Sequence, residues 1–210
     1  MHYKDDFPIF EKAFIPEDII YLDSAATTLK PKKVIERVCR FYEKETSNIA
    51  RGNHFLAEKN GIEFEEVREK VAHFLKAQSD EIIFTENCTS SINLIASSLA
   101  LQAEDEVIVS ILEHHSNYLP WQQKAKIKIA QADEDGQIDL NHLESLINSK
   151  TKIIAVTCAS NVTGNIQPMK EMVALSKKYG VPILLDGSQI VSHHPVDLNE
   201  LGCDFFVFSS

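Results

Sequence analysis

Segments rich in apolar residues alternate with amphipathic segments along the chain, and this alternation predicts strands and helices in turn. The segments expected to form strands are 81–85, 106–111, 126–130, 152–157, 181–186 and 204–209. They are short and rich in β-branched and aromatic residues, a composition typical of strands. Three of them, 152–157, 181–186 and 204–209, are nearly continuous apolar runs, which indicates strands buried on both faces.

The segments between these strands carry the signals of helices. Helices are expected at 31–45, 61–76, 90–100, around Trp121, after Asp139 and at 168–179. In the first two, apolar residues recur every three or four positions, which is the period of a helix. Pro31 is a favourable helix start, Asp139 is a plausible N-cap, and Gly180 is a typical stop.

Apolar strands separated by helices predict an α/β fold, in which a mostly parallel sheet is covered by helices on both faces. The sequence shows no repeat, no low-complexity tract and no obvious linker. Ligands of such sheets bind where the strands reach their carboxyl ends. The residues that follow each strand are therefore the first candidates for a functional site.

Composition narrows the class of function. The 210 residues carry a formal charge of −10, with 31 acidic and 21 basic residues. This balance argues against non-specific nucleic-acid binding and against docking on an anionic membrane, since both need a basic face. The first residues lack the pattern of a signal peptide, and no apolar stretch reaches the length of a membrane helix. We expect a cytoplasmic protein.

The four cysteines, Cys39, Cys88, Cys158 and Cys203, are far apart and form no CxxC pair. This spacing argues against a disulfide framework and against a zinc ribbon. At least three of the four are expected to be buried thiols.

Two strand ends carry small polar or imidazole groups. After 81–85 comes ENCTSSIN, where Cys88, Thr89 and Ser90 lie at the start of a helix whose free N–H groups could hold a phosphate. For this segment alone, ordinary helix capping is the better explanation. After 106–111 comes LEHHSNYLPW, which contains His114 and His115. Neighbouring side chains on a strand point to opposite faces, so we expect one histidine to face a site and the other to pack away, and we expect no metal.

Two further strand ends carry Asn161 and Asp186. Asn161 follows 152–157 and could bond a ligand at that edge, or it could simply form a turn leading to Gly164. Asp186 ends the apolar run ILLD, and a carboxylate buried there needs a cation or several donors. The alternative for Asp186 is a helix cap, but the burial expected after ILL favours a partner. The sequence lacks GxGxxG, GxxxxGK[ST] and GxSxG, so no dinucleotide, nucleoside triphosphate or serine-hydrolase motif is present.

Together these segments resemble the class V aminotransferase-fold enzymes that use pyridoxal 5′-phosphate (PLP), and most closely the SufS-like group II cysteine desulfurases. The matching stretches are YLDSAATTLKP, ARGNH, CTSSIN, EHHSNYLPW, ASNVTGNIQP, LLDGSQIVSHHPVD and CDFFVFS. They run in order and at the family's spacing from about Asp6 to the last residues. Each stretch alone is weak, whereas the ordered set is highly specific.

The resemblance implies a role for each candidate residue. Asp186 would keep the pyridine nitrogen protonated, His114 would stack on the ring and could move protons, and Gln189 would bond the ring's phenolic oxygen. Asn161 would lie near the same oxygen or the substrate carboxylate. The phosphate would be held by the Cys88 backbone N–H, Thr89 and Ser209. Arg51 and His54 match a segment that in the family lines the substrate entrance, partly across a dimer interface.

The resemblance also implies residues that these 210 positions do not contain. In the family, the segment matching FVFSS is followed at once by His-Lys, and that lysine is the Schiff-base lysine. The family's catalytic cysteine lies further on, and none of the four cysteines here matches it. We therefore expect an N-terminal arm at 1–20, an incomplete PLP-binding large domain at 21–210, and a missing C-terminal small domain. The sheet, which has seven strands in the family, would be incomplete at its C-terminal end.

The function implied is a PLP-dependent cysteine desulfurase that converts L-cysteine to L-alanine and passes sulfur, as an enzyme persulfide, to an acceptor protein for iron–sulfur cluster assembly. A homodimer is expected, and the 210 residues alone are expected to be inactive. Ala50, Asn87 and Cys88 stand where these enzymes usually have histidine, glycine and threonine. The loss of the histidine at Ala50 leaves selenocysteine, or another substrate within the fold, open. The alternatives are another enzyme of the fold, such as an aminotransferase, an epimerase or a selenocysteine lyase, and a non-catalytic truncated binding module.

Overall fold

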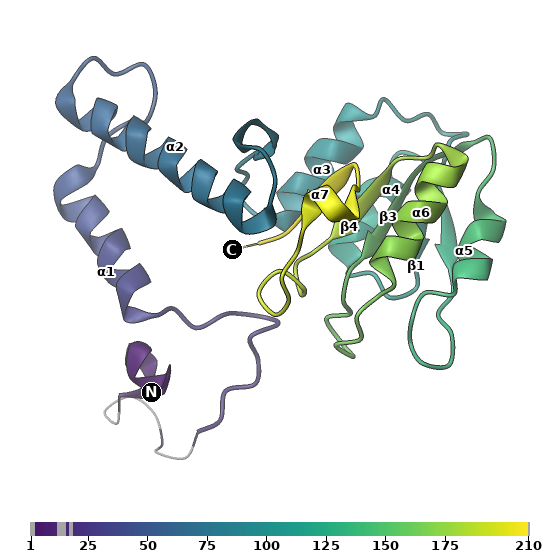
Figure 1. The fold of residues 1–210 in the computed structure, drawn as a ribbon, viewed down its shortest axis with the longest axis horizontal. Helices are drawn as coiled ribbons and strands as arrows, with labels where there is room; N and C mark the ends of the chain where they lie inside the picture. Colours follow the sequence, from purple (N-terminus) through teal and green to yellow (C-terminus); the bar gives the residue numbers. More distant parts are fainter. Residues whose placement is uncertain (1–2, 12–15, 17–18, 210) are drawn as a thin grey trace. The chain divides into compact units, whose positions relative to one another are not determined.

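The computed structural model describes residues 3–11, 16 and 19–209 (Figure 1). The contacts of the chain divide it into two compact units, Met1–Lys70 and Val71–Ser210. The predicted N-terminal arm, 1–20, includes positions outside the described residues, and its boundary stays a prediction.

The first unit is built from helical segments. Short 3-10 helices η1 (Tyr3–Asp6) and η2 (Pro8–Phe10) precede α1 (Lys32–Arg40), which continues as the π-helix η3 (Phe41–Glu45) and is followed by α2 (Phe55–Leu75). Pro31 is the N-cap of α1, as expected from its fixed φ. The predicted helix at 31–45 is thus confirmed, with a wider last turn, whereas α2 begins earlier than the predicted Gly61.

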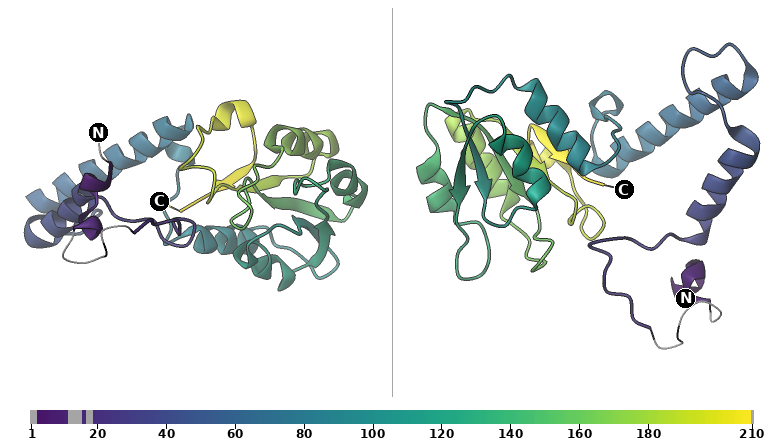
Figure 2. Two further views of the ribbon diagram at one scale, coloured as in Figure 1. Left: turned by 90° about the horizontal axis from the view of Figure 1, so that it is seen from below. Right: turned by 180° about the vertical axis from the view of Figure 1, so that it is seen from behind.

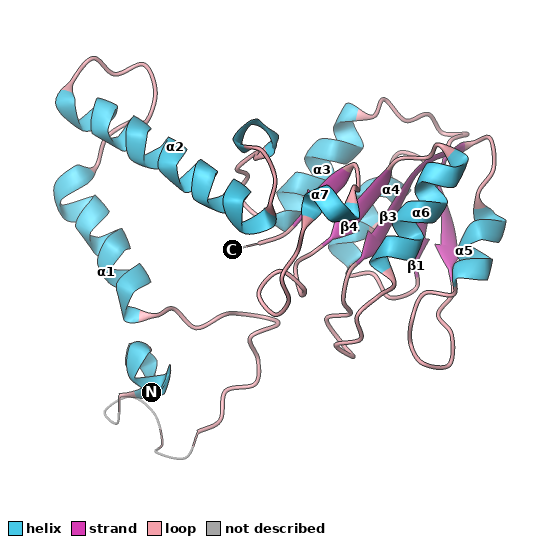
Figure 3. Ribbon diagram, in the orientation of Figure 1, coloured by secondary structure: helices cyan, strands magenta, loops and turns pink. Residues whose placement is uncertain are grey.

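The described residues of the second unit form a five-stranded parallel sheet in the order β2-β1-β3-β4-β5 (Figure 3). The strands are β1 (Glu106–Ser110), β2 (Lys126–Ala130), β3 (Thr151–Thr157), β4 (Ile183–Asp186) and β5 (Phe205–Val207). The predicted parallel sheet is confirmed, and these five strands lie within or next to the segments predicted for them.

Helices precede the first strand of this unit and connect the later ones. They are η4 (Ser79–Glu81), α3 (Cys88–Ser98), η5 (His115–Asn117), α4 (Leu119–Gln122), α5 (Leu140–Leu146), α6 (Met169–Tyr179) and α7 (Leu198–Leu201). Asp139 caps α5 by accepting hydrogen bonds from the backbone N–H groups of Asn141 and His142, as predicted. Gly180 ends α6 with a left-handed φ of 64°, which glycine adopts without strain. None of the helices in the described part of the chain is long and apolar enough to cross a membrane.

Alternate residues of the strands supply two apolar clusters, one on each face of the sheet. Ile108, Ile154 and Leu185 belong to the cluster that includes residues of α5 and α6. Val109 and Leu184 belong to the cluster that includes Ile92 of α3 and Trp121 of α4. Figure 2 shows helices on opposite sides of the strands. Full burial of such side chains stabilises the fold by about 1.5–3 kcal/mol each, so the two clusters fix the strands and the positions where they end.

The prediction of a strand at 81–85 is wrong. Glu81 closes η4, and Ile82 is extended (φ −91°, ψ 121°) but belongs to no ladder. A strand needs a neighbour to pair with, and among the described residues the sheet ends at β5. The apolar content of the segment therefore produces extended backbone without pairing.

Candidate functional site

The site candidate is the edge of the sheet where the parallel strands reach their carboxyl ends. Thr157, the last residue of β3, lies in register with Asp186, the last residue of β4. Asp186 in turn lies in register with Val207 of β5. The loops that carry the candidate side chains therefore leave neighbouring strands at the same edge.

Asp186 is a buried carboxylate, with 5% of its surface exposed. One of its oxygens accepts hydrogen bonds from the backbone N–H of Ser188 (3.0 Å) and from the thiol of Cys88 (3.5 Å). None of the ion pairs among the described residues includes Asp186. A charge buried at this depth is costly without a cationic partner, so Asp186 is suited to bind a cationic group of a ligand.

The N-terminus of α3 meets the end of β5 beside Asp186. The backbone N–H of Cys88 donates to the hydroxyl of Ser209 (3.1 Å). Asn87 caps the helix by accepting from the N–H of Ser90 (2.8 Å), so the capping predicted as the plain explanation is present. The exposed Thr89 lies in the first turn of the helix. A helix N-terminus lined by hydroxyl groups is suited to bind an anion.

His114 lies in the loop that follows β1. Its side chain caps η5, because Nδ1 accepts from the N–H of Ser116 (3.2 Å) and lies 2.7 Å from the Ser116 hydroxyl. The rings of His114 and His115 lie against each other, with centroids 4.0 Å apart at 35°, and both residues are exposed. The prediction that one histidine packs away is wrong, because these residues enter a 3-10 turn and side chains alternate only on a strand.

Asn161 and Gln189 follow β3 and β4. Asn161 is exposed at the start of a turn in which the Ser160 hydroxyl accepts from the N–H groups of Val162 and Thr163. The turn leads to Gly164, whose φ is 76°, as the turn alternative for this segment required. Gln189 is partly exposed in the turn after Asp186.

Glu113 is a candidate that the sequence reasoning missed. Its carboxylate accepts from the Ser110 hydroxyl (2.5 Å) and the Thr157 backbone N–H (2.9 Å) through Oε1, and from Asn117 Nδ2 (2.7 Å) through Oε2. Burial raises the pKa of Glu113 to about 7 against the three hydrogen bonds that lower it, and the charge of Asp186 raises it further. The available signal was a carboxylate placed directly before the two histidines at a strand end.

The cysteines are free thiols of differing exposure: Cys39 is exposed, Cys203 is partly buried, and Cys88 and Cys158 are buried. The expectation of at least three buried thiols is therefore only partly met. Burial, followed by the charge of Asp186, raises the pKa of Cys88 to about 12, and the same two causes raise the pKa of Cys158. Neither buried thiol is suited to be a nucleophile at neutral pH, because the thiolate is the reactive form.

Arg51 and His54 belong to the first unit. Both are exposed and line an open pocket of about 880 Å³ together with residues of α2. Arg51 has a positive φ of 59°, and His54 Nδ1 accepts from the N–H of Ala57 (3.4 Å) at the start of α2.

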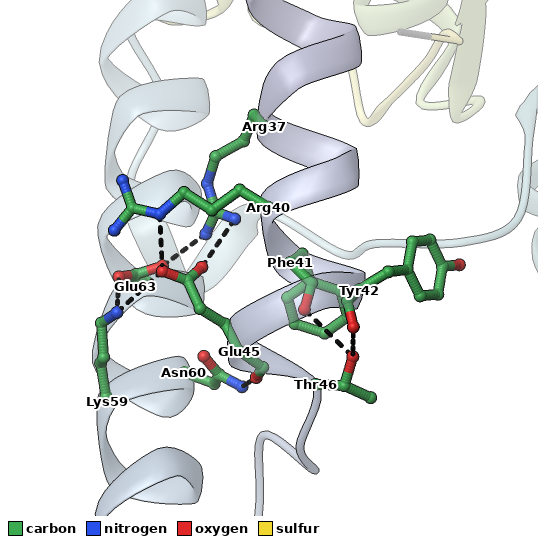
Figure 4. Close-up of polar contacts among 9 residues, drawn as sticks. All are labelled: Arg37, Arg40, Phe41, Tyr42, Glu45, Thr46, Lys59, Asn60 and Glu63. Atoms are coloured by element: carbon green, nitrogen blue, oxygen red, sulfur yellow. Dashed lines mark hydrogen bonds and ion pairs between the residues drawn. The ribbon is translucent and has the colours of Figure 1, made fainter.

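The loop that carries Arg51 and His54 lies next to an ionic cluster, the Glu45 cluster, formed by Arg37, Arg40, Glu45 and Lys59 around the buried Glu45 carboxylate (Figure 4). The carboxylate of Glu45, 3% exposed, accepts from Arg37 Nη1, Arg40 Nε and Lys59 Nζ, each at 2.9 Å. Asn60 Nδ2 also bonds the Glu45 carbonyl (2.6 Å). These contacts join α1 and η3 to α2 and lower the pKa of Glu45, chiefly through Lys59.

The structure thus brings Cys88, Asp186 and Ser209 into contact and links the His114 loop to the same edge through Glu113 and Thr157. Thr89, Asn161 and Gln189 lie on elements that reach this edge. No group of His, Cys, Asp and Glu among the described residues is arranged to hold a metal ion.

Comparison with known proteins assigns the chain to a family. Residues 20–210 match the aminotransferase class-V family. The chain is 42% identical to a cysteine desulfurase of Synechococcus elongatus, over 97% of this chain and 34% of that protein. It is 41% identical to a cysteine desulfurase of Pectobacterium atrosepticum, over 97% of this chain and 52% of that protein. The chain therefore spans between about a third and about a half of these relatives.

Solved structures give the same result for the fold. The apo cysteine desulfurase from Thermococcus onnurineus superposes with a TM-score of 0.86 at 33% identity, covering 98% of this chain and 52% of that one. The cysteine desulfurase CsdA from Escherichia coli superposes with a TM-score of 0.84 at 34% identity, covering 99% of this chain and 53% of that one. The predicted fold class, the aminotransferase-like PLP-dependent transferase fold, is confirmed.

Proposed function

The chain belongs to the aminotransferase class-V family, and from this premise we propose that the protein containing it is a PLP-dependent cysteine desulfurase. The observation that carries the proposal is Asp186, a buried carboxylate without an ion-pair partner among the described residues, next to the open N-terminus of α3. The similarity to proteins named cysteine desulfurase supports this choice among the activities of the family.

The residues at this edge fit the chemical groups of PLP. Asp186 supplies the carboxylate that a protonated pyridine nitrogen needs, because a buried charge is stabilised by an opposite one. The N–H of Cys88 with the hydroxyls of Thr89 and Ser209 would bind the phosphate at the helix N-terminus. Gln189 and Asn161 would bind the ring's phenolic oxygen, and His114 would stack on the ring.

Bound PLP would supply an electron sink for carbanion chemistry at the substrate's α-carbon. Asp186 would hold the proton on the pyridine nitrogen and so keep the ring electron-poor. His114 has its Nδ1 engaged by the Ser116 N–H, which leaves Nε2 as the atom that could carry a proton to or from a ligand. Arg51 and His54 would contact the substrate at its entrance.

The reaction proposed is the conversion of L-cysteine to L-alanine, with the sulfur leaving as a persulfide on an enzyme cysteine and passing to an acceptor protein for iron–sulfur cluster assembly in the cytoplasm. The raised pKa values of Cys88, Cys158 and Cys203 argue against these three thiols as the persulfide carrier. Cys39 is exposed but does not match the position of the family's catalytic cysteine, so we propose that the persulfide forms on a cysteine outside these 210 residues. The lysine expected to bind PLP also lies outside them, so the 210 residues alone are proposed to be inactive.

A homodimer is part of the proposal. Helix α1 exposes Val34 (45%), Ile35 (41%) and Val38 (50%), and the π-helix that follows exposes Tyr42 (73%). An apolar face of this size on one helix is typical of a protein–protein interface, and a second copy of the chain is the partner proposed for it.

The test is to supply the full-length protein with PLP and L-cysteine and to measure the products. A cysteine desulfurase releases alanine and, with a thiol reductant present, an equal amount of sulfide, and it leaves an added keto acid unchanged. Consumption of the keto acid without sulfide would instead establish an aminotransferase. Product from selenocysteine alone would establish a selenocysteine lyase, and no product from either substrate would favour a non-catalytic binding module.

A further inference from the structure

Glu113, which is partly exposed, bonds three buried partners in a hydrogen-bond network at the start of the His114 loop. It is joined through its two oxygens to the ends of two strands and to η5: Ser110 ends β1, Thr157 ends β3, and Asn117 belongs to η5. Ser110, Thr157 and Asn117 are 3%, 7% and 0% exposed. The carboxylate therefore joins the His114 loop to the end of β3, where Thr157 lies in register with Asp186 of β4.

Two groups that can only donate, the Trp121 indole N–H and the Thr157 backbone N–H, fix which atoms donate and which accept in this network. The indole of Trp121, which can only donate, donates Nε1–H to Asn117 Oδ1 (3.0 Å). The Asn117 amide must therefore turn its NH₂ group toward Glu113. The backbone N–H of Thr157 is also an obligatory donor, so Glu113 meets fixed donors at both of its oxygens.

Only a carboxyl group at position 113 can accept from both the Asn117 amide and the Thr157 N–H. An ionised carboxylate accepts at both oxygens, and a protonated one still does if the Ser110 hydroxyl turns to accept its proton. A glutamine of the same shape fails in either orientation, because its NH₂ group must face either the NH₂ of Asn117 or the N–H of Thr157. A buried donor left facing a donor loses its hydrogen bond and its water together.

We propose that Glu113 is the positioning residue of this site: it holds the loop carrying His114 against the ends of β1 and β3, so that the imidazole lies over the edge where Asp186 ends β4. His114 follows Glu113 directly in the chain. The Asn117 side chain donates to the Glu113 carboxylate, and the Asn117 backbone N–H donates to the His114 carbonyl (2.8 Å). Asn117 therefore holds both Glu113 and His114 in place. The inference deepens the proposed function, on which the assignment of His114 to PLP rests.

The proposal can be tested by exchanging the carboxyl group of Glu113 and the amide group of Asn117. Glu113→Gln places two NH₂ or N–H groups face to face, and Asn117→Asp places two carboxyl groups face to face. The double variant Glu113→Gln/Asn117→Asp restores every bond, since the new amide donates to the new carboxylate, which still accepts from Trp121, and it keeps one acid in the network. Glu134→Gln is the matched control, because Glu134 is exposed in the turn between β2 and α5.

The measurement uses the full-length protein without cofactor, labelled with 5-fluorotryptophan and with ¹³C-histidine. The signals of Trp121 and His114 are identified by their loss in Trp121→Phe and His114→Gln. We expect both signals to move in each single variant, to return to their wild-type positions in the double variant, and to stay in place in Glu134→Gln. PLP affinity, measured by equilibrium dialysis, should fall about tenfold in Glu113→Gln, the size of one lost buried hydrogen bond, and recover in the double variant.

An unchanged His114 signal in Glu113→Gln would overturn the proposal, as would a double variant no closer to wild type than either single one. Failure of the wild-type protein to bind PLP would overturn the proposed function instead. In that case the two labelled signals would still decide whether Glu113 positions the loop.

Discussion

At the scale of the residue, the site depends on two acids that are satisfied in different ways: Asp186 is buried, and Glu113 is partly exposed but bonded to buried partners. Glu113 has donors at both oxygens, whereas Asp186 has one backbone N–H and a weak thiol donor. Glu113 is thus complete within the protein, and Asp186 retains capacity for a ligand. This difference assigns Glu113 to positioning and Asp186 to binding.

The pKa of Glu113 gives a pH prediction. The value rises from 4.5 to about 7 on folding, so between these values the folded state binds the proton more tightly than the unfolded state does. The contribution of Glu113 to the free energy of unfolding therefore falls as pH rises from about 4.5 to 7, by about 3 kcal/mol in total. The charge that faces it is Asp186, and it favours the protonated form of Glu113.

The titration is measured at the Thr157 amide, whose proton bonds the carboxylate directly. We expect its NMR resonance to move with a midpoint near pH 7 in the wild-type protein and to lose that transition in Glu113→Gln. A midpoint near 4.5 would show that burial does not raise the pKa of Glu113. In urea unfolding, raising the pH from 5 to 7.5 should lower the free energy of unfolding of the wild-type protein more than that of Glu113→Gln.

Residue-level sequence reasoning found Asp186 and Cys88 but not Glu113. The run ILLD marks Asp186 as buried because the strand around it is apolar on both faces. Glu113 lies beyond the end of β1 in an irregular loop, where periodicity gives no burial signal. Its partners, Thr157 and Asn117, are specified by the pairing of strands and by a short 3-10 turn, and neither can be read from spacing alone.

At the scale of the element, the first unit depends on the Glu45 cluster. The π-helix at the end of α1 widens the last turn, and Glu45 there meets Arg37, Arg40 and Lys59. Burial of one carboxylate among three cations joins α1 to α2 just before the loop of Arg51 and His54. π-turns are often found at functional sites, which fits the position of this one.

We predict that Glu45→Gln weakens the packing of α1 on α2, because it leaves three cations around a neutral group. Thermal unfolding should begin at a lower temperature, and the amides of the Arg51–His54 loop should exchange hydrogen faster. Glu43→Gln is the control, since Glu43 is exposed in the same π-turn. Equal effects of the two variants would show that the cluster has no structural role.

The sign of the pH effect is opposite to that of Glu113. The pKa of Glu45 is lowered in the folded state, mainly by the hydrogen bond from Lys59. Its stabilising contribution is therefore complete above the ordinary value of 4.5 and is lost as pH falls below it. The difference between the wild-type protein and Glu45→Gln should accordingly shrink in acid.

Sequence patterns predicted a strand correctly where the residues favour a strand and a neighbouring strand is present to pair with it. β2 matches its predicted segment, since Lys126–Ala130 is a short β-rich run beside a second strand. The segment 81–85 has the same kind of composition but no strand to pair with among the described residues. Pairing is a property of the sheet, so the sequence of one segment cannot determine it.

At the scale of the whole molecule, the chain matches only part of the length of its relatives. It spans 34% and 52% of two relatives named cysteine desulfurase. The described sheet ends at β5, beside a pocket lined by Phe84, Phe206 and Phe208. The PLP contacts proposed here come from loops at one edge of this sheet and from the N-terminus of α3, which meets the end of β5.

The most direct test of the account is equilibrium dialysis of PLP against the full-length protein and its Asp186→Asn variant, with melting curves to show that both are folded. We predict about one PLP per chain in the wild-type protein. In the variant, affinity should be at least about tenfold weaker, since a hydrogen bond to a charged group contributes about 1.5–3 kcal/mol. Absence of binding in the wild-type protein, or equal affinity in the folded variant, would contradict the claim that these strand ends form a PLP site.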